Sequence, residues 1–211
     1  MWAHDGPERD FEEVVVTGRW TDLSGTAISA SEGLVGQEEL DIRPRLRTGE
    51  VLEVILGLII TQHSGTGKSN QMFLRGFNLD HGTDFSTSID GMPINMPSRG
   101  HGQGYTDLNF VISELIESVE FRKGPYHAEV GDFSSTGSAH LSTFKVLPES
   151  MLKIGVSQDG YQQLLVADSV GIASGSLLYA AQTHGYDGPW VDINHNGRWR
   201  YIPIQPVRLD T

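Results

Sequence analysis

The sequence lacks cysteine, long apolar runs and an excess of basic residues, and each absence excludes a class of protein. Because there is no cysteine, a disulfide scaffold, thiol catalysis and zinc sites built on thiolates are excluded. The longest uninterrupted apolar run covers only residues 54–60, whereas a membrane-spanning helix needs about 20 residues. With 15 basic against 27 acidic residues and a net charge of −12, nucleic-acid binding is not expected, since phosphate neutralisation requires Lys and Arg.

The start of the chain also lacks the features of a secretory signal. Residues 1–10 have no basic segment, no apolar core and no small-residue cleavage site. The sequence as written therefore predicts either a cytosolic protein or a processed or truncated part of a longer one. Its 211 residues suit one to two domains.

Residues 1–40 are predicted to be flexible, because they are acidic and carry little periodic apolar pattern. They hold nine acidic residues and two arginines. Val14, Val15 and Val16 interrupt this segment, and three consecutive β-branched residues favour an extended backbone. Two interpretations stay open: an edge strand of the following domain, or a peptide that adds itself to the sheet edge of another protein.

Glycine is abundant, at 25 of 211 residues, which favours tight turns and strands over long helices. A helix is predicted over residues 49–56, with Thr48 as its N-cap. Asp90 and Gly91 indicate a turn between two apolar runs. Short strand-like runs are expected at 58–62, 71–75, 86–89 and 118–123. Together with a glycine-rich polar loop at 97–106, this pattern predicts a compact α+β domain.

After residue 148 the hydrophobic pattern changes to alternation of apolar with polar or small residues. Segments of about ten residues with this period indicate either the wall of a transmembrane β-barrel or a soluble β-sandwich, and this stretch alone leaves both open. The apolar positions are Leu152, Ile154, Val156, Leu164, Val166, Val170, Leu177, Tyr179 and Ala181.

Residues 62–69 come close to a phosphate-binding loop, in which glycines let backbone N–H groups cradle phosphates and a lysine reaches the terminal oxygens. Gln62 replaces the leading glycine. The segment after Lys68 and Ser69 is predicted to be a strand, although the motif requires a helix there. A solvent-exposed turn therefore explains this stretch better than nucleotide binding.

Residues 192–197 match the first half of a calcium loop, with oxygen ligands at alternate positions before a glycine. The bidentate glutamate that should follow falls at Pro203. A polar loop rich in turn-forming residues is the simpler interpretation.

The eight histidines show no tight ligand spacing on a predicted helix. His81, His101, His127 and His140 would need the fold to bring them together. No nucleophile–histidine–acid arrangement and no pair of acids suited to hydrolysis is recognisable. The sequence therefore predicts no enzymatic activity, no resident metal and no cofactor.

Four ordered motifs between residues 12 and 145 carry a resemblance to a known family. They read EEVVVTG in the acidic tail, then VLEVILGLIITQHSG, FLRGFNLDHGTDFSTSIDGMPIN and LIESVEFRKGPYHAEVGDFSSTGSAHLSTF. In sequence and order they resemble the plug domain of a TonB-dependent outer-membrane receptor. The resemblance implies a plug that fills the lumen of a 22-stranded barrel, with ligand bound on its outward-facing loops.

The fold class expected from the resemblance is an α+β plug with a short mixed sheet, followed by the start of an antiparallel transmembrane β-barrel. The expected domains are residues 1–40 (flexible, with the box that TonB binds), 41–148 (plug) and 149–211 (first barrel strands). Only about four wall strands fit after residue 149, so the chain is expected to be a fragment. The implied partners are TonB, outer-membrane lipid and a small-molecule ligand.

The resemblance also implies site residues. Arg75 matches the arginine that pairs with acidic groups on the barrel wall, and Arg122 and Lys123 belong to the same plug–barrel contact. Lys123 stands where the family usually has arginine, and lysine lacks the planar fork for a bidentate carboxylate pair. The residues that resemble the TonB box are Glu13, Val14, Val15, Val16 and Thr17. The candidate ligand-binding loop residues are Asp80, His81, Asp84, Arg99, His101, Gln103 and Tyr105.

The expected function is active uptake of a scarce nutrient across the outer membrane, energised through TonB. A ferric siderophore or another metal chelate is the expected cargo, while cobalamin, oligosaccharides and other nutrients remain open. Two alternatives come from other classes. One is a soluble periplasmic interaction module that imports nothing, and the other is a nucleotide-hydrolysing enzyme built on residues 65–69.

Overall fold

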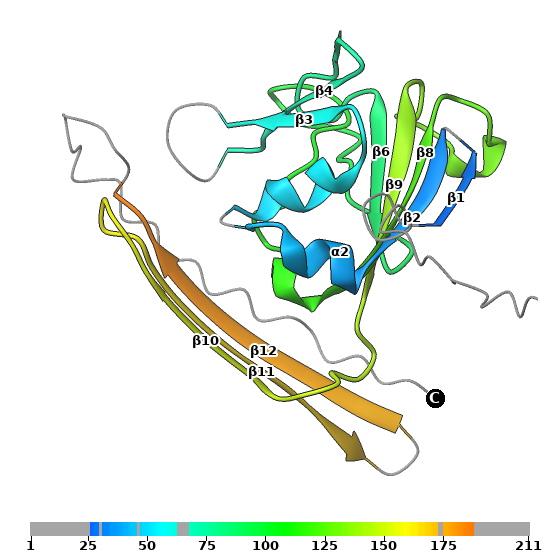
Figure 1. Cartoon of the computed structure of the whole chain (residues 1–211). Helices are drawn as coiled ribbons and strands as arrows, with labels where there is room; N and C mark the ends of the chain where they lie inside the picture. The colour runs from blue at the N-terminus through cyan, green and yellow to red at the C-terminus, as the bar shows by residue number, and fades with distance from the viewer. Residues whose placement is uncertain (1–25, 30, 46, 63–67, 173–174, 188–211) are drawn as a thin grey trace, which may run out of the picture.

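The computed structural model describes residues 26–29, 31–45, 47–62, 68–172 and 175–187. Figure 1 shows two parts, a mixed domain formed by the residues up to about 147 and a long, curved antiparallel sheet that follows it. We call these parts the mixed domain and the C-terminal sheet. Among the described residues, no helix is long and apolar enough to cross a membrane.

The mixed domain is built on a six-stranded sheet with the order β1-β2-β8-β9-β6-β7. Its neighbours pair antiparallel, except that β6 and β9 run parallel. Val35 lies opposite Val119, which in turn lies opposite Leu141, and all three are fully buried. This row of apolar side chains fixes the register of the three central strands. The strands are β1 (Thr26–Ser29), β2 (Glu32–Gly36), β6 (Phe85–Ile89), β7 (Met92–Pro93), β8 (Ile116–Lys123) and β9 (Gly137–Thr143).

A smaller sheet and several short helices complete the mixed domain, whose main core lies against the strands β2, β6, β8 and β9. The small sheet, of order β3-β4-β5, contains β3 (Leu58–Thr61), β4 (Gln71–Leu74) and β5 (Phe77–Asn78). The helical elements are α2 (Gln37–Ile42) and the 3₁₀ helices η1 (Thr48–Val54), η2 (Ser113–Leu115) and η3 (Ala128–Val130).

The predicted strands at 58–62, 71–75, 86–89 and 118–123 correspond to β3, β4, β6 and β8. The predicted helix at 49–56 is a 3₁₀ helix that begins at Thr48 and ends at Val54, with Arg47 rather than Thr48 as N-cap. Buried side chains surround this element on several sides, since Val51, Leu52 and Val54 are all core residues. Its β-branched residues also disfavour a longer α-helix.

The prediction that the flexible segment extends to residue 40 is wrong for the described part of that segment. β1, β2 and α2 lie there, and β2 pairs with the central strand β8 from Glu32 to Gly36. Val35 and Leu40 are fully buried, so the segment has core anchors despite its acidic composition. Two widely spaced anchors give almost no periodic signal, which is why the sequence did not predict this element.

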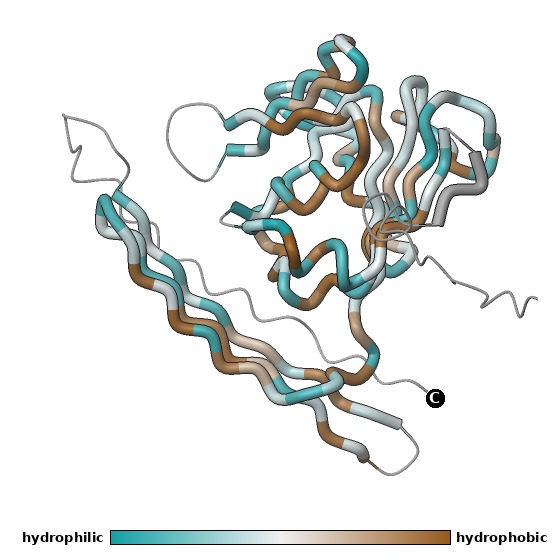
Figure 2. Tube along the Cα trace, viewed as in Figure 1, coloured by the Kyte–Doolittle hydropathy of each residue, from teal (hydrophilic) through white to brown (hydrophobic). Residues whose placement is uncertain are grey.

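The C-terminal sheet consists of β10 (Met151–Val156), β11 (Gln162–Ile172) and β12 (Gly175–Gly185), joined in sequence order. One face packs on the mixed domain through Leu165, Ala167, Leu178 and Ala180. The opposite face is apolar and exposed, with Leu152, Ile154, Val156, Leu164 and Val166 on it. Figure 2 shows apolar and polar residues following one another along these strands. The three described strands do not close on themselves, and they resemble the start of a barrel wall.

A substitution at Gly137 tests the packing of β8 against β9, because the backbone there leaves no room for a side chain. Its φ is 152° and an added Cβ would clash with the Arg122 carbonyl oxygen. We expect Gly137→Ala to lower the free energy of unfolding by at least about 2 kcal/mol, measured by urea denaturation and far-UV circular dichroism. In the matched control Gly36→Ala, nothing lies within 4 Å of the added atom, so a loss as large as that of Gly137→Ala would contradict this explanation.

Candidate functional site

The glycine-rich loop between β7 and η2 folds back over the residues that follow β5. A bridge closes the base of the loop, in which the Met96 N–H donates to the Tyr105 carbonyl at 3.0 Å and the Gly104 N–H donates to the Met96 carbonyl at 2.8 Å. The Thr106 N–H donates to the His81 carbonyl at 2.8 Å. The backbone therefore ties the loop to a segment that is distant in sequence.

Asn95 fixes this arrangement from within the domain. Its buried side-chain amide donates to the carbonyl oxygens of Gly82, Phe85 and Gly104 at 2.9, 3.0 and 3.1 Å. Its amide oxygen accepts from the Thr87 N–H at 2.6 Å. One side chain thus holds both segments that carry the candidate residues.

Five of the seven candidate loop residues come together at this point. The His81 and His101 ring centroids are 4.7 Å apart, and they lie 5.3 and 6.0 Å from the Tyr105 ring centroid. The guanidinium carbon of Arg99 lies 3.4 Å from the same Tyr105 centroid. One carboxylate oxygen of Asp80 lies 3.7 Å from His81 Nε2, and the other lies 4.0 Å from His101 Nε2. We call these five residues the loop cluster.

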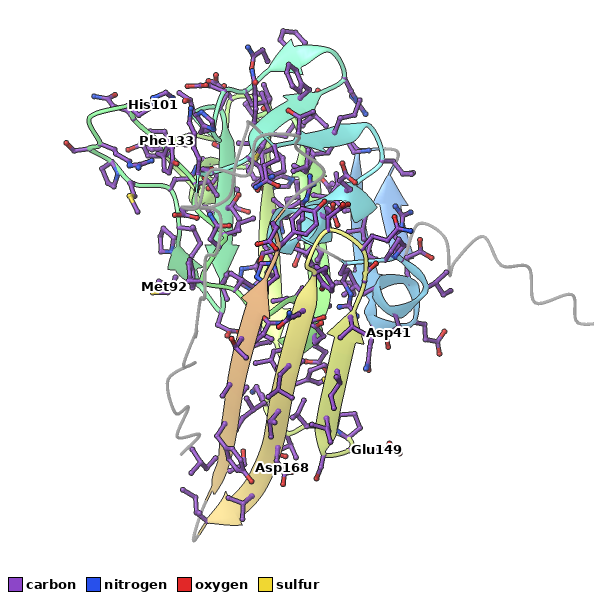
Figure 3. The ribbon with its side chains drawn as sticks, turned by 90° about the vertical axis from the view of Figure 1, so that its left-hand side faces the viewer. Asp41, Met92, His101, Phe133, Glu149 and Asp168 are labelled. Atoms are coloured by element: carbon purple, nitrogen blue, oxygen red, sulfur yellow. The ribbon has the colours of Figure 1, made fainter. Side chains whose placement is uncertain are left out.

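The loop cluster lies far from the connection that leads from the mixed domain into the C-terminal sheet. In Figure 3, His101 lies near the upper end, whereas Glu149 and Asp168 lie near the lower end. Tyr105 is buried beneath the loop, and its hydroxyl accepts a hydrogen bond from the Ser69 N–H at 2.8 Å. Tyr105 is therefore the buried aromatic member of the cluster, and the loop covers it.

Asp84 and Gln103, the other two candidates, make different contacts. Asp84 accepts a hydrogen bond from the Ser135 hydroxyl at 2.7 Å, which directs its carboxylate toward the loop before β9. The backbone carbonyl of Gln103 accepts from the Thr83 hydroxyl at 3.1 Å. Asp84 thus holds a neighbouring loop, and Gln103 contributes through its backbone.

Burial sets the protonation state of His81, which is only 2% exposed. Burial lowers the pKa of His81 below its ordinary value of 6.5, while the hydrogen bond to the Asn70 carbonyl and the charge of Asp80 partly oppose this effect. The net direction is downward, so the imidazole is neutral at pH 7. A neutral imidazole has one ring nitrogen with a lone pair.

Two other histidines that the sequence singled out are engaged elsewhere. His127 Nε2 lies 2.8 Å from a Glu32 carboxylate oxygen, and His140 Nδ1 lies 2.8 Å from the Ser88 hydroxyl. The fold therefore brings His81 and His101 together and keeps His127 and His140 apart from them.

The three residues predicted for the plug–barrel contact have different environments. Arg122 forms ion pairs within the domain, with Glu120 at 3.1 Å and Glu129 at 3.0 Å. Lys123 is 6% exposed, and burial together with the nearby charge of Arg75 lowers its pKa below 10.5. Within the described residues, neither Arg75 nor Lys123 has a carboxylate at ion-pair distance.

The contact between the mixed domain and the described part of the C-terminal sheet centres on Glu114, which sequence reasoning missed. Its carboxylate is 4% exposed and lies 2.7 Å from Lys153 Nζ in β10. The same oxygen accepts from the Gln163 amide in β11 at 3.2 Å, and the Ser113 hydroxyl donates to the second oxygen. The available signal was an acidic residue inside the apolar run from Val111 to Ile116.

Two predicted features lie outside the described residues, namely the box at 13–17 and the calcium-type loop at 192–197. The phosphate-loop candidate lies partly outside them. The structure describes the strand β4 after its Lys68 and Ser69, and the Ser69 hydroxyl donates to the Thr106 carbonyl. Ser69 is thus part of the support beneath the loop, and the helix that nucleotide binding requires is a strand.

Comparison with known proteins identifies relatives of the same fold. The TonB-dependent receptor plug domain matches residues 23–138. A double mutant of the ferric enterobactin receptor PfeA from Pseudomonas aeruginosa superimposes with a TM-score of 0.60 at 18% identity, over 79% of this chain and 26% of that one. The siderophore receptor PirA from Acinetobacter baumannii gives 0.55 at 24% identity, over 79% and 26%.

The ferric yersiniabactin uptake receptor FyuA from Yersinia pestis gives a TM-score of 0.56 at 19% identity, over 85% of this chain and 28% of that one. The chain thus spans about a quarter of the length of these solved structures. At these identities the likeness shows the fold, a plug with a mixed sheet followed by further strands like those that begin a barrel. Because the plug match covers more than half of the sequence, the chain belongs to the family of TonB-dependent receptor plug domains.

Proposed function

We propose that the chain is the plug, with the first wall strands, of an outer-membrane receptor that imports a scarce nutrient and takes its energy from TonB. The observation that carries this proposal is the plug-domain match over residues 23–138, followed directly by three antiparallel strands. The outward apolar face of those strands suits contact with lipid hydrocarbon. In this role the protein is a transporter rather than an enzyme.

The proposed cargo is a ferric siderophore or another metal chelate. PfeA, PirA and FyuA are by name a ferric enterobactin receptor, a siderophore receptor and a ferric yersiniabactin uptake receptor, which favours this class. The loop cluster supports the same proposal, because it presents a carboxylate, two imidazoles, a guanidinium and an aromatic ring within one loop region. The loop cluster lies far from the connection between the mixed domain and the C-terminal sheet (Figure 3), which suits a position at the outward end of the plug.

The proposed contact with the wall of a surrounding barrel uses Arg75 and Lys123. The two cations are close enough for the charge of Arg75 to lower the pKa of Lys123, and the described residues supply no carboxylate for either. Two adjacent cations without an acid favour an acidic partner from outside the described chain. Arg122 is a weaker candidate, since Glu120 and Glu129 already bind it.

Uptake in cells tests the proposal. The gene in its natural reading frame is expressed in a Gram-negative strain that lacks its own siderophore receptors, and accumulation of ⁵⁵Fe-labelled siderophores is measured. We expect accumulation that a protonophore abolishes and that Val15→Pro in the proposed TonB box abolishes as well, because proline removes a backbone donor and fixes φ.

Asp22→Pro, outside the box, is the matched control and should leave accumulation unchanged. Accumulation that persists in Val15→Pro, or that does not depend on the proton-motive force, would contradict the proposal. Binding of TonB without accumulation of any siderophore or metal tested would favour the other candidate, an interaction module without transport.

A further inference from the structure

The loop cluster contains three metal-ligating side chains from two segments of the chain. Asp80 and His81 follow β5, and His101 comes from the loop above them. One ligand atom from each residue lies within 4.8 Å of the other two. The sequence named these three residues as loop candidates but predicted no metal site, because the two histidines become neighbours only through the fold of the loop.

The hydrogen bond at His81 determines which of its nitrogens can bind a metal. His81 Nδ1 lies 3.1 Å from the Asn70 carbonyl oxygen. A carbonyl can only accept, so Nδ1 carries the proton and Nε2 carries the lone pair of the neutral ring. A histidine that binds a metal through one nitrogen commonly donates its other N–H to a carbonyl or carboxylate.

The carboxylate of Asp80 lies between the two imidazoles. One of its oxygens is 3.7 Å from His81 Nε2, and the other is 4.0 Å from His101 Nε2. The Asp80 backbone has a φ of 49°, in the left-handed region that aspartate tolerates better than most residues. The Asn78 side-chain oxygen accepts from the Asp80 N–H at 2.9 Å, and this local turn orients the carboxylate.

The separations suit a small first-row metal ion. Ligand atoms at about 2.0–2.2 Å from a tetrahedral zinc ion lie about 3.3–3.6 Å from one another. The three candidate ligand atoms lie within 4.8 Å of one another, so a bound ion requires a closure of roughly 1 Å. His101 can supply it, because it lies on the exposed part of the loop and 44% of its side chain is accessible. His81 is buried and held by Asn70, so it forms the fixed side of the site.

The geometry points to a binding site for a divalent transition metal of the zinc class, formed by Asp80 Oδ, His81 Nε2 and His101 Nε2 with one coordination position left open. Two imidazoles and one carboxylate are the ligand set of many zinc sites in which a fourth position takes water or an external ligand. The Arg99 guanidinium, held over the Tyr105 ring, adds positive charge nearby and favours an anionic or oxygen-rich group at that position.

As a binding site for a metal ion, this inference stands on the three side chains. As a site for transported cargo, it rests on the proposed function. In that role the receptor would bind the metal ion directly instead of recognising only the organic chelator around it.

Isothermal titration of the metal-stripped 211-residue chain with Zn²⁺ tests the site. We expect one saturable binding event that both Asp80→Asn and His101→Ala weaken by at least about tenfold, since each removes a ligand of the same ion. His81 is left unchanged because it is buried and its loss would disturb the fold. The controls His127→Ala and His140→Ala remove histidines outside the cluster and should leave this event unchanged.

Two further measurements keep the inference falsifiable. Co²⁺ in place of Zn²⁺ should give the intense visible absorption of four-coordinate cobalt, which His101→Ala abolishes, while Ca²⁺ should not bind to the cluster. The inference is overturned if the wild-type chain binds neither Zn²⁺ nor Co²⁺, or if the cluster variants and the control variants bind alike. Metal binding without metal uptake in cells would keep the site and remove its cargo role, whereas siderophore uptake without metal binding would keep the proposed function and overturn the site.

Discussion

Asn95→Ala is expected to lower the free energy of unfolding by about 2–4 kcal/mol, the largest effect that we expect from a polar substitution in this chain. The wild-type amide satisfies the carbonyls of Gly82, Phe85 and Gly104 and the N–H of Thr87. The Gly82 and Gly104 carbonyls keep a second donor, the Phe85 N–H and the Thr106 hydroxyl respectively, whereas the Thr87 N–H loses the acceptor that Asn95 provides. A buried polar group left without a partner costs about 1–3 kcal/mol, and the lost bonds to the carbonyls add to this. Because Gly82 and Gly104 flank the loop cluster, Zn²⁺ affinity should fall together with stability.

Urea denaturation measures the effect, and Asn109→Ala is the matched control. Among the described residues, the Asn109 side-chain amide donates only to the nearby, half-buried Asp107, at 2.8 Å, so its removal should cost less than about 1 kcal/mol. Asn95→Asp adds a second test, since a carboxylate would face three carbonyl oxygens and should destabilise the domain further. A loss below about 1 kcal/mol in Asn95→Ala would show that the amide does not hold the two segments together.

Lys153→Met is expected to loosen the C-terminal sheet from the mixed domain. It leaves the buried Glu114 carboxylate with only the neutral partners Gln163 and Ser113. Loss of one partner from a buried pair costs about 3–5 kcal/mol, but 46% of the Lys153 side chain is accessible. Solvent screening reduces the expected loss to about 2 kcal/mol. Limited proteolysis should then cleave the segment between β9 and β10 faster.

The pH dependence of this loss follows from the pKa of Glu114. Burial alone would raise that pKa, but the hydrogen bond and charge of Lys153 outweigh burial and hold it below 4.5. A carboxylate with a lowered folded-state pKa stabilises the protein above its unfolded-state pKa, and this stabilisation is lost as the pH falls through the folded-state pKa. The difference between wild type and Lys153→Met should therefore be full at pH 7 and shrink below about pH 4.5.

Urea denaturation at pH 7 and pH 4 measures this difference. Lys145→Met is the control, because it removes an exposed lysine near the same segment and should change stability by less than about 0.5 kcal/mol. A loss in Lys153→Met that is equal at both pH values, or that matches the control, would contradict the assigned role of the Glu114–Lys153 pair.

The strands and turns were largely predictable from the sequence where a local residue pattern determines them. The alternating strands β10 to β12 and the turn at Asp90 and Gly91 follow from period-two hydrophobicity and turn chemistry. β2 and α2 were missed because the anchors Val35 and Leu40 lie in an acidic, glycine-containing segment. The strand β2 forms because it pairs with the distant strand β8, and local propensity does not predict such long-range pairing.

The candidate site was predictable as a list of residues but not as a geometry. The resemblance to plug domains, whose outward loops bind ligand, identified all five members of the loop cluster as candidates. Their grouping depends on Asn95 and on the Met96–Tyr105 bridge, contacts that sequence spacing does not encode. For the same reason, Asp84 and Glu114 gained their partners Ser135 and Lys153 only through the fold.

Binding to the periplasmic C-terminal domain of TonB tests the central claim, that this chain is a plug coupled to TonB, most directly. Isothermal titration of the wild-type chain should give one-to-one binding, and Val15→Pro should abolish it because strand addition needs the backbone N–H that proline lacks. Asp22→Pro should bind like the wild type. An affinity that is the same in all three chains, or no binding by the wild type, would contradict the account.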